Sequence, residues 1–181
     1  MKLSILGLAI TAVIAPAFTM SLSVLLLWAF DTLPEIFSMA ADTRQAFGYT
    51  SSGDHLWSSI GRLLYDFFFG PFVSVPFGFI GAAIFLAPTL ALASLRGGIQ
   101  NYMVAGGLSG AAHAACGLML APLLSESYDW LALALGFLPY EMREIAITTA
   151  VSAPLAGVLA GYVYGRRVRK RSAGSLRSEP K

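Results

Sequence analysis

Residues 67–95 have the sequence FFFGPFVSVPFGFIGAAIFLAPTLALASL and contain no Asp, Glu, Lys or Arg. A helix needs about 20 apolar residues to cross the hydrocarbon core of a bilayer, so this run is long enough. Three more charge-free runs occur in the chain, at residues 3–30, 97–125 and 145–165. The sequence therefore predicts an all-α integral membrane protein with four transmembrane helices in one domain, residues 1–165. The predicted spans are about 3–30, 70–95, 99–124 and 143–165.

The composition of the whole chain agrees with this class. Apolar residues make up 56% of the 181 residues, charged residues only 12%, and the mean hydropathy is +0.69. Soluble globular domains are about 25% charged. The composition therefore excludes a water-soluble enzyme, a disordered tail and a nucleic-acid-binding protein.

The basic residues predict the orientation in the membrane. Nine of the twelve Lys and Arg fall at Lys2, at Arg96 and in the tail 166–181. Lys and Arg concentrate in the cytoplasmic segments of membrane proteins. We expect both termini in the cytoplasm, a basic cytoplasmic tail over residues 166–181, and insertion in a bacterial inner membrane.

The first apolar run also has features of a secretory signal, because Lys2 precedes it and Ala15-Pro16-Ala17 resembles a cleavage site. Signal peptides have apolar regions of about 7–15 residues, however, and here apolar sequence resumes at residues 22–30. We therefore expect this segment to remain as the first span.

Both predicted outer loops contain segments suited to the membrane surface. In the loop 31–69, apolar residues from Asp54 to Phe69 recur at helical spacing, which predicts an interfacial helix before a turn at Gly70-Pro71. Residues 128–138 are apolar but too short to cross, so they are expected to be re-entrant or interfacial. Residues expected at the lipid headgroups are Trp57, Tyr65, Trp130, Arg166, Arg167, Arg169, Lys170 and Arg171.

Small residues repeat at every fourth position in the last three spans. Such stripes let helix backbones approach closely in lipid, where there is little hydrophobic drive for helices to associate. The stripes are Gly70, Ser74, Gly78 and Ala82; Gly106, Gly110 and Ala114; and Thr149, Ala153, Gly157, Gly161 and Gly165. They predict a tight helix bundle, and they leave open whether some of these faces also meet another chain.

One intramembrane position carries an ionisable side chain, His113 in the third span. Ser109, His113 and Cys116 are spaced so that they share one helix face. A histidine in the membrane is a candidate functional site. The alternatives are a neutral, hydrogen-bonded histidine, a solute pathway, and a haem or metal ligand. Met103, Met119 or the histidine of a second copy would then be the other axial ligand.

The stretch Gly106-Gly107-Leu108-Ser109-Gly110 resembles the Gly-x-Ser-Gly motif of rhomboid intramembrane proteases. In that family the serine is the nucleophile and a histidine on a later helix is its base. Here the only histidine after Ser109 is His113, on the same helix, which leaves no cleft between nucleophile and base. We therefore interpret the stretch as a packing helix and predict no protease activity.

The remaining features favour a protein without catalytic chemistry. The spans contain no Asp, Glu, Lys or Arg, and the chain has no ATP-binding loop, no His-Glu-x-x-His motif and one cysteine. The sequence predicts a non-enzymatic accessory or assembly subunit of a larger membrane complex. Its expected partners are membrane lipids and other membrane subunits or itself, with no nucleic acid and no cofactor. The alternatives are a small-solute permease or channel near Ser109 and His113, and a haem-binding redox module that uses His113.

Overall fold

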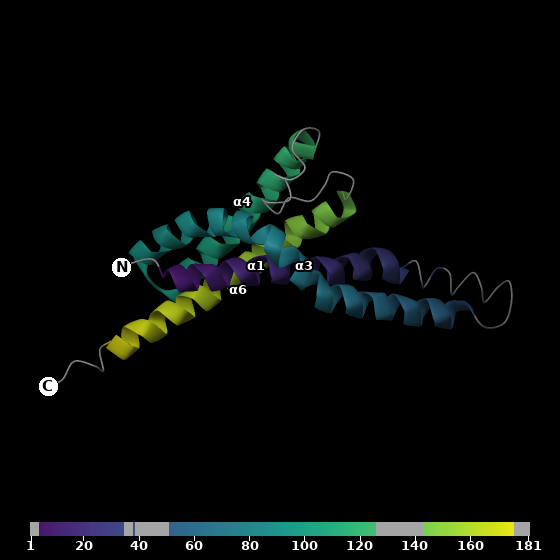
Figure 1. Ribbon diagram of the computed structural model, residues 1–181, viewed down its shortest axis with the longest axis horizontal. Helices are drawn as coiled ribbons and strands as arrows, with labels where there is room; N and C mark the ends of the chain where they lie inside the picture. The colour runs from purple at the N-terminus through teal and green to yellow at the C-terminus, as the bar shows by residue number, and fades with distance from the viewer. Residues whose placement is uncertain (1–3, 35–37, 39–50, 126–142, 176–181) are drawn as a thin grey trace.

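The computed structural model describes residues 4–34, 38, 51–125 and 143–175, and within these it contains helices and no strand (Figure 1). The helices are α1 (Ile5–Leu27), the π-helical turn η1 (Trp28–Thr32) that continues it, α3 (Ser51–Arg96), α4 (Ile99–Ser125) and α6 (Arg143–Ser175). The predicted segment 128–138 lies outside the described residues.

Three helices in this described part are long and apolar enough to cross a membrane. They are Ile5–Phe30, Gly78–Arg96 and Ile99–Leu120, with 26, 19 and 22 residues. The prediction of an all-helical membrane protein is confirmed to this extent. The fourth predicted span, 143–165, lies within α6 but is not among the three.

The helices form an up-down-up-down bundle in which each helix packs against two neighbours. α1 packs against α3 and α6, and α4 packs against the same two helices. The end with the N-terminus and the α3–α4 turn brings all four helices together. At the other end the α1–α3 pair and the α4–α6 pair diverge (Figure 1).

The first helix is part of the bundle interior. Ser4 caps α1 by accepting a hydrogen bond from the Gly7 backbone N–H at 3.2 Å. Ala12 is fully buried in the core, together with Leu86 and Leu90 of α3. Removal of the first 17 residues would therefore open the core.

The turn predicted at Gly70-Pro71 is wrong, because α3 is helical without interruption from Ser51 to Arg96. Pro71 has no N–H, so the carbonyl of Phe67 loses its partner within the helix. The Ser21 hydroxyl of α1 donates a hydrogen bond to that carbonyl at 3.4 Å. Hydroxyls of neighbouring helices commonly satisfy carbonyls freed by proline in membrane helices, and this contact explains how α3 continues.

Candidate functional site

Among the glycines that the structure describes, those with the tightest backbone contacts lie between α4 and α6. A β-carbon on Gly106 would collide with the carbonyl oxygen of Gly157, and one on Gly157 would collide with the carbonyl of Gly106. A β-carbon on Gly110 would meet the Ala153 carbonyl carbon at 2.6 Å. Only glycine permits this approach of two backbones, and such contacts stabilise helix pairs in lipid.

The α4–α6 contacts follow a regular antiparallel register. Gly110 lies opposite Ala153, Gly106 opposite Gly157, and Tyr102 opposite Gly161, so each step of four residues on α4 matches a step of four on α6. One turn further along α6, a β-carbon on Gly165 would lie 2.8 Å from the Tyr102 ring. The structure thus brings the predicted stripes of the third and fourth spans together within one chain.

The stripe on α3 meets α1 instead. A β-carbon on Gly78 would lie 2.6 Å from the Pro16 β-carbon, and one on Gly70 would lie 3.2 Å from the Met20 side chain. The Ser74 hydroxyl lies between them and donates to the carbonyls of Pro16 at 3.4 Å and Pro71 at 3.1 Å. Ala82 continues the stripe into the buried core, whereas Ala114 on α4 is half-buried.

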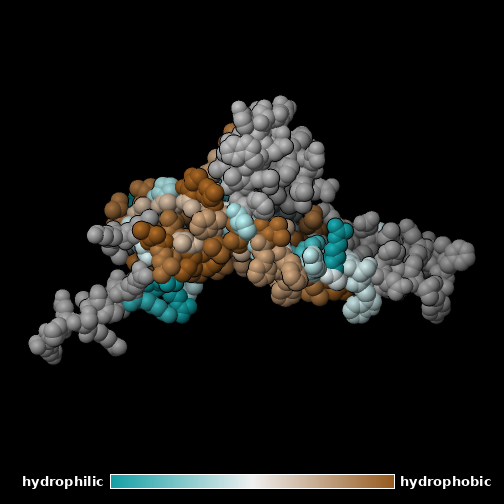
Figure 2. All heavy atoms as spheres, viewed as in Figure 1, coloured by the Kyte–Doolittle hydropathy of each residue, from teal (hydrophilic) through white to brown (hydrophobic). Residues whose placement is uncertain are grey.

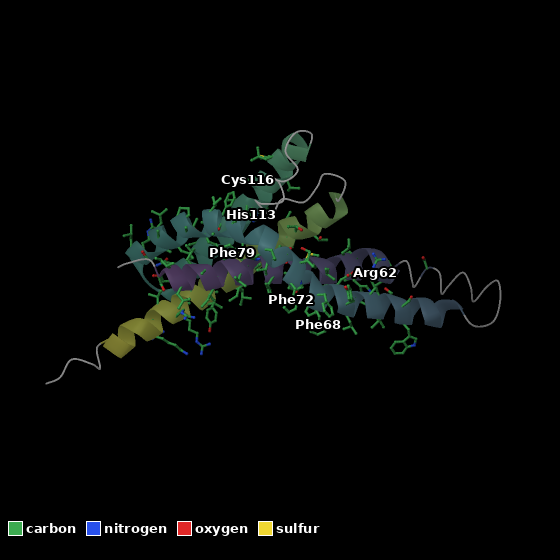
Figure 3. The ribbon with its side chains drawn as sticks, viewed as in Figure 1. Arg62, Phe68, Phe72, Phe79, His113 and Cys116 are labelled. Atoms are coloured by element: carbon green, nitrogen blue, oxygen red, sulfur yellow. The ribbon has the colours of Figure 1, made fainter. Side chains whose placement is uncertain are left out.

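The three polar residues of the third span differ in their surroundings. Ser109 is 2% exposed in the bundle interior. The His113 imidazole packs against the Phe85 ring of α3, with ring centroids 5.1 Å apart and planes inclined by 34°. Cys116 is half-buried with a free thiol. Figure 3 shows His113 and Cys116 on the same length of α4.

The geometry restricts how His113 would hold a haem. Met103 lies ten residues before it and Met119 six residues after it on the same helix, about 15 Å and about 9 Å along the axis. Two axial ligands must approach the iron from opposite faces, so neither methionine of this chain suits that role. Among the described residues no group of three or more His, Cys, Asp or Glu side chains converges. The remaining route to a haem site is His113 from each of two copies.

One cluster of hydroxyls and one contact between a hydroxyl and a backbone N–H were not predicted from the sequence. Ser23 of α1 and Ser152 of α6 are both buried, with their hydroxyl oxygens 2.6 Å apart, and Thr149 lies 3.4 Å from Ser23. At the other end, the Tyr164 hydroxyl accepts a hydrogen bond from the Ser4 backbone N–H at 3.1 Å. The sequence shows these residues only as hydroxyls inside charge-free runs, and this pattern does not identify the helix that each hydroxyl contacts.

Tyr102 packs against Tyr164, with ring centroids 5.3 Å apart. Tyr102 is 3% exposed, and its hydroxyl has no hydrogen-bond partner among the described residues. A buried hydroxyl without a partner costs free energy, so the pair combines one satisfied and one unsatisfied phenol.

The residues expected at the lipid headgroups lie at the two ends of the bundle. Trp57 and Tyr65 are exposed on the first half of α3, while Arg166, Arg169 and Lys170 are exposed and Arg167 half-buried near the end of α6. Those on α6 belong to the helix itself, because α6 continues to Ser175. Trp130 and the side chain of Arg171 lie outside the described residues.

Comparison with protein-family models, with curated proteins and with solved structures finds no match to this chain.

One face of α4 remains uncovered by the other described helices. Ala111, Ala112 and Ala115 are exposed, although the adjacent Gly110 is in close contact with α6. Met119 continues this uncovered surface and is 73% exposed. Only 11% of the apolar span of α4 is buried, less than in α1 or α3. Small residues on an uncovered membrane helix allow the backbone of another helix to approach.

Proposed function

We propose that this chain is a non-enzymatic accessory or assembly subunit that binds another membrane protein through the exposed alanines of α4. In this proposal the chain crosses a bacterial inner membrane four times, with residues 143–165 as the fourth span and both termini in the cytoplasm. The charge-free runs and the excess of basic residues at one end support this topology.

A single observation supports the partner-binding role most strongly. The glycines of α4 and α6 are already used within the chain, yet Ala111, Ala112 and Ala115 remain exposed on α4. Lipid does not require small side chains on a helix face, whereas a packed partner helix benefits from them. The α4 face is therefore suited to a transmembrane helix of another subunit.

The first experiment is native mass spectrometry of the protein extracted gently from its own membrane. The test variant is Ala112→Leu, and the matched control is Ala91→Leu, since Ala91 is an exposed helical alanine on α3. We expect a foreign subunit to accompany the wild type and Ala91→Leu and to be lost from Ala112→Leu. A wild-type spectrum that contains only this chain would contradict the proposal.

A second candidate function is a small-solute permease, which the buried hydroxyls favour. Thr11, Ser23, Ser109 and Ser152 are polar side chains inside the apolar bundle. In proteoliposomes this function predicts solute flux that His113→Ala changes, because His113 lies one turn from Ser109. A broad solute panel without flux would exclude this candidate.

A haem-binding module is the third candidate, with His113 of two copies as axial ligands. It predicts a Soret band after haem-supplemented expression that His113→Ala abolishes. A colourless wild-type preparation would exclude this candidate.

A further inference from the structure

The α3–α4 turn and the end of α6 lie at the same level of the bundle. The register pairs Gly106 with Gly157 and Tyr102 with Gly161, and a β-carbon on Gly165 would meet the Tyr102 ring, so Gly165 lies beside the first turn of α4. Gly97 and Gly98 connect α3 to α4 in two residues, both with positive φ. The residues just before this turn therefore share one end of the molecule with those that follow Gly165.

Cations from two separate segments gather at this end. Arg96 is the last residue of α3 and is exposed. On α6, the four residues Arg166, Arg167, Arg169 and Lys170 follow Gly165 within about one and a half turns. Figure 2 shows a hydrophilic patch where α6 leaves the bundle.

The acidic side chain that the structure describes lies at the end of the bundle opposite to these cations. Asp66 is the one acidic residue whose side chain the structure describes, and it pairs with Arg62 at 3.8 Å on the first half of α3. The N-termini of α1 and α4, by contrast, lie at the same end as the cations, since Ser4 contacts Tyr164. The C-termini of α3 and α6 also lie toward this end, so their partial negative charge offsets the partial positive charge of these N-termini, and the basic side chains supply the positive field.

The cations border directly on exposed apolar surface. Leu95 is 81% exposed beside Arg96, and Leu92, one turn earlier on α3, is 65% exposed. On α4, Val104 is 61% exposed. A protein or nucleic-acid partner in water would not require this apolar border, whereas the phosphate plane of a bilayer lies directly above its acyl chains.

We propose that Arg96 and the α6 cations Arg166, Arg167, Arg169 and Lys170 form one surface that binds anionic phospholipid headgroups of the adjoining leaflet. The α3–α4 turn lies between the two groups of cations. This surface is more than a basic tail, because it includes Arg96, which lies 70 residues before Arg166 in the chain. It is independent of the partner-binding role of α4.

The test uses the full chain reconstituted from detergent into nanodiscs of phosphatidylcholine and phosphatidylglycerol in equal parts. Native mass spectrometry then counts the lipids that remain bound. We expect retained phosphatidylglycerol to exceed phosphatidylcholine in the wild type. Arg96→Gln and the double variant Arg166→Gln/Arg167→Gln should each lower this preference, by about fivefold or less per charge removed.

Two control variants separate charge from folding and position. Arg96→Lys keeps the charge and should keep the preference, and Arg62→Gln removes an exposed arginine at the other end and should leave it unchanged. An unchanged preference in Arg96→Gln, with a loss in the double variant, would show that the α6 cations act alone and would overturn the proposal. The proposal is also overturned if the wild type has no preference, or if excess inorganic phosphate displaces the lipid.

Discussion

Gly106 of α4 and Gly157 of α6 contact each other through their backbones, so that a β-carbon on either residue would overlap the carbonyl of the other. Each carbonyl group is part of a hydrogen-bonded helix, so it cannot shift unless the whole helix shifts with it. The separation of α4 and α6 is therefore set by the absence of two side chains.

Gly106→Ala should destabilise the bundle by about 1–3 kcal/mol, because the added methyl forces the helices apart. Gly61→Ala is the matched control, since a β-carbon on Gly61 has nothing within 4 Å. The control should be neutral or gain about 0.5–1 kcal/mol from the better helix propensity of alanine. Unfolding by sodium dodecyl sulfate in mixed micelles measures both, and equal midpoints for Gly106→Ala and wild type would contradict the prediction.

Tyr164→Phe should lower the stability of the bundle, whereas Tyr102→Phe should not. Tyr164→Phe leaves the Ser4 N–H without its acceptor and should cost about 1 kcal/mol. Tyr102→Phe removes a buried hydroxyl without a described partner, so it should be neutral or stabilising. The same unfolding assay compares them, and a clear loss in Tyr102→Phe would reveal a hydrogen-bond partner for Tyr102.

Ser23 and Ser152 should be energetically coupled across α1 and α6. Their hydroxyl oxygens are 2.6 Å apart, and interhelical hydrogen bonds in membranes contribute about 0.6 kcal/mol on average. A double-mutant cycle with Ser23→Ala and Ser152→Ala measures the coupling. Ser94→Ala serves as the control partner for Ser23→Ala, because the Ser94 hydroxyl donates to the Ala91 carbonyl of its own helix, and this second cycle should give no coupling.

The proposed topology predicts which ends of the bundle face the periplasm. In a Cys116→Ser background, a membrane-impermeant maleimide added to intact cells should label Arg62→Cys and leave Arg169→Cys unlabelled. Permeabilised cells should label both, because both positions are exposed. Labelling of Arg169→Cys in intact cells would reverse the orientation.

Several small residues spaced four apart lie at close helix contacts in the structure, but the spacing itself does not say which helices meet. Gly78 and Gly106 belong to equivalent stripes, yet Gly78 contacts Pro16 of α1 and Gly106 contacts Gly157 of α6. A period of four residues marks a face and contains no information on the partner. The pairing emerges only when all the helices are assembled.

The error at Gly70-Pro71 has a similar origin. Proline disfavours a helix interior because it removes one backbone hydrogen bond and its ring clashes with the carbonyl four residues earlier, and glycine does so through its backbone entropy. Within this bundle the Phe67 carbonyl finds Ser21 instead, at a separation of 46 residues in sequence. Local sequence rules cannot anticipate a partner that another helix supplies.

The candidate site was predicted as residue types rather than as an arrangement. The sequence placed Ser109 and His113 on one face, but it could not show that the imidazole packs on Phe85 while Ser109 is buried. The tyrosine pair Tyr102 and Tyr164 was missed, because the two residues lie 62 positions apart and neither belongs to a recognised motif.

The two-residue connection at Gly97 and Gly98 has a consequence for biogenesis. The Gly97 N–H still bonds to the Ala93 carbonyl at 3.0 Å, so α3 ends within the turn and α4 begins at Ile99. A linker of two residues keeps the ends of α3 and α4 close together. We therefore expect the two helices to leave the insertion machinery together as a hairpin. Arg96 would then act as the residue that stays behind on the side of synthesis while both apolar arms enter the bilayer.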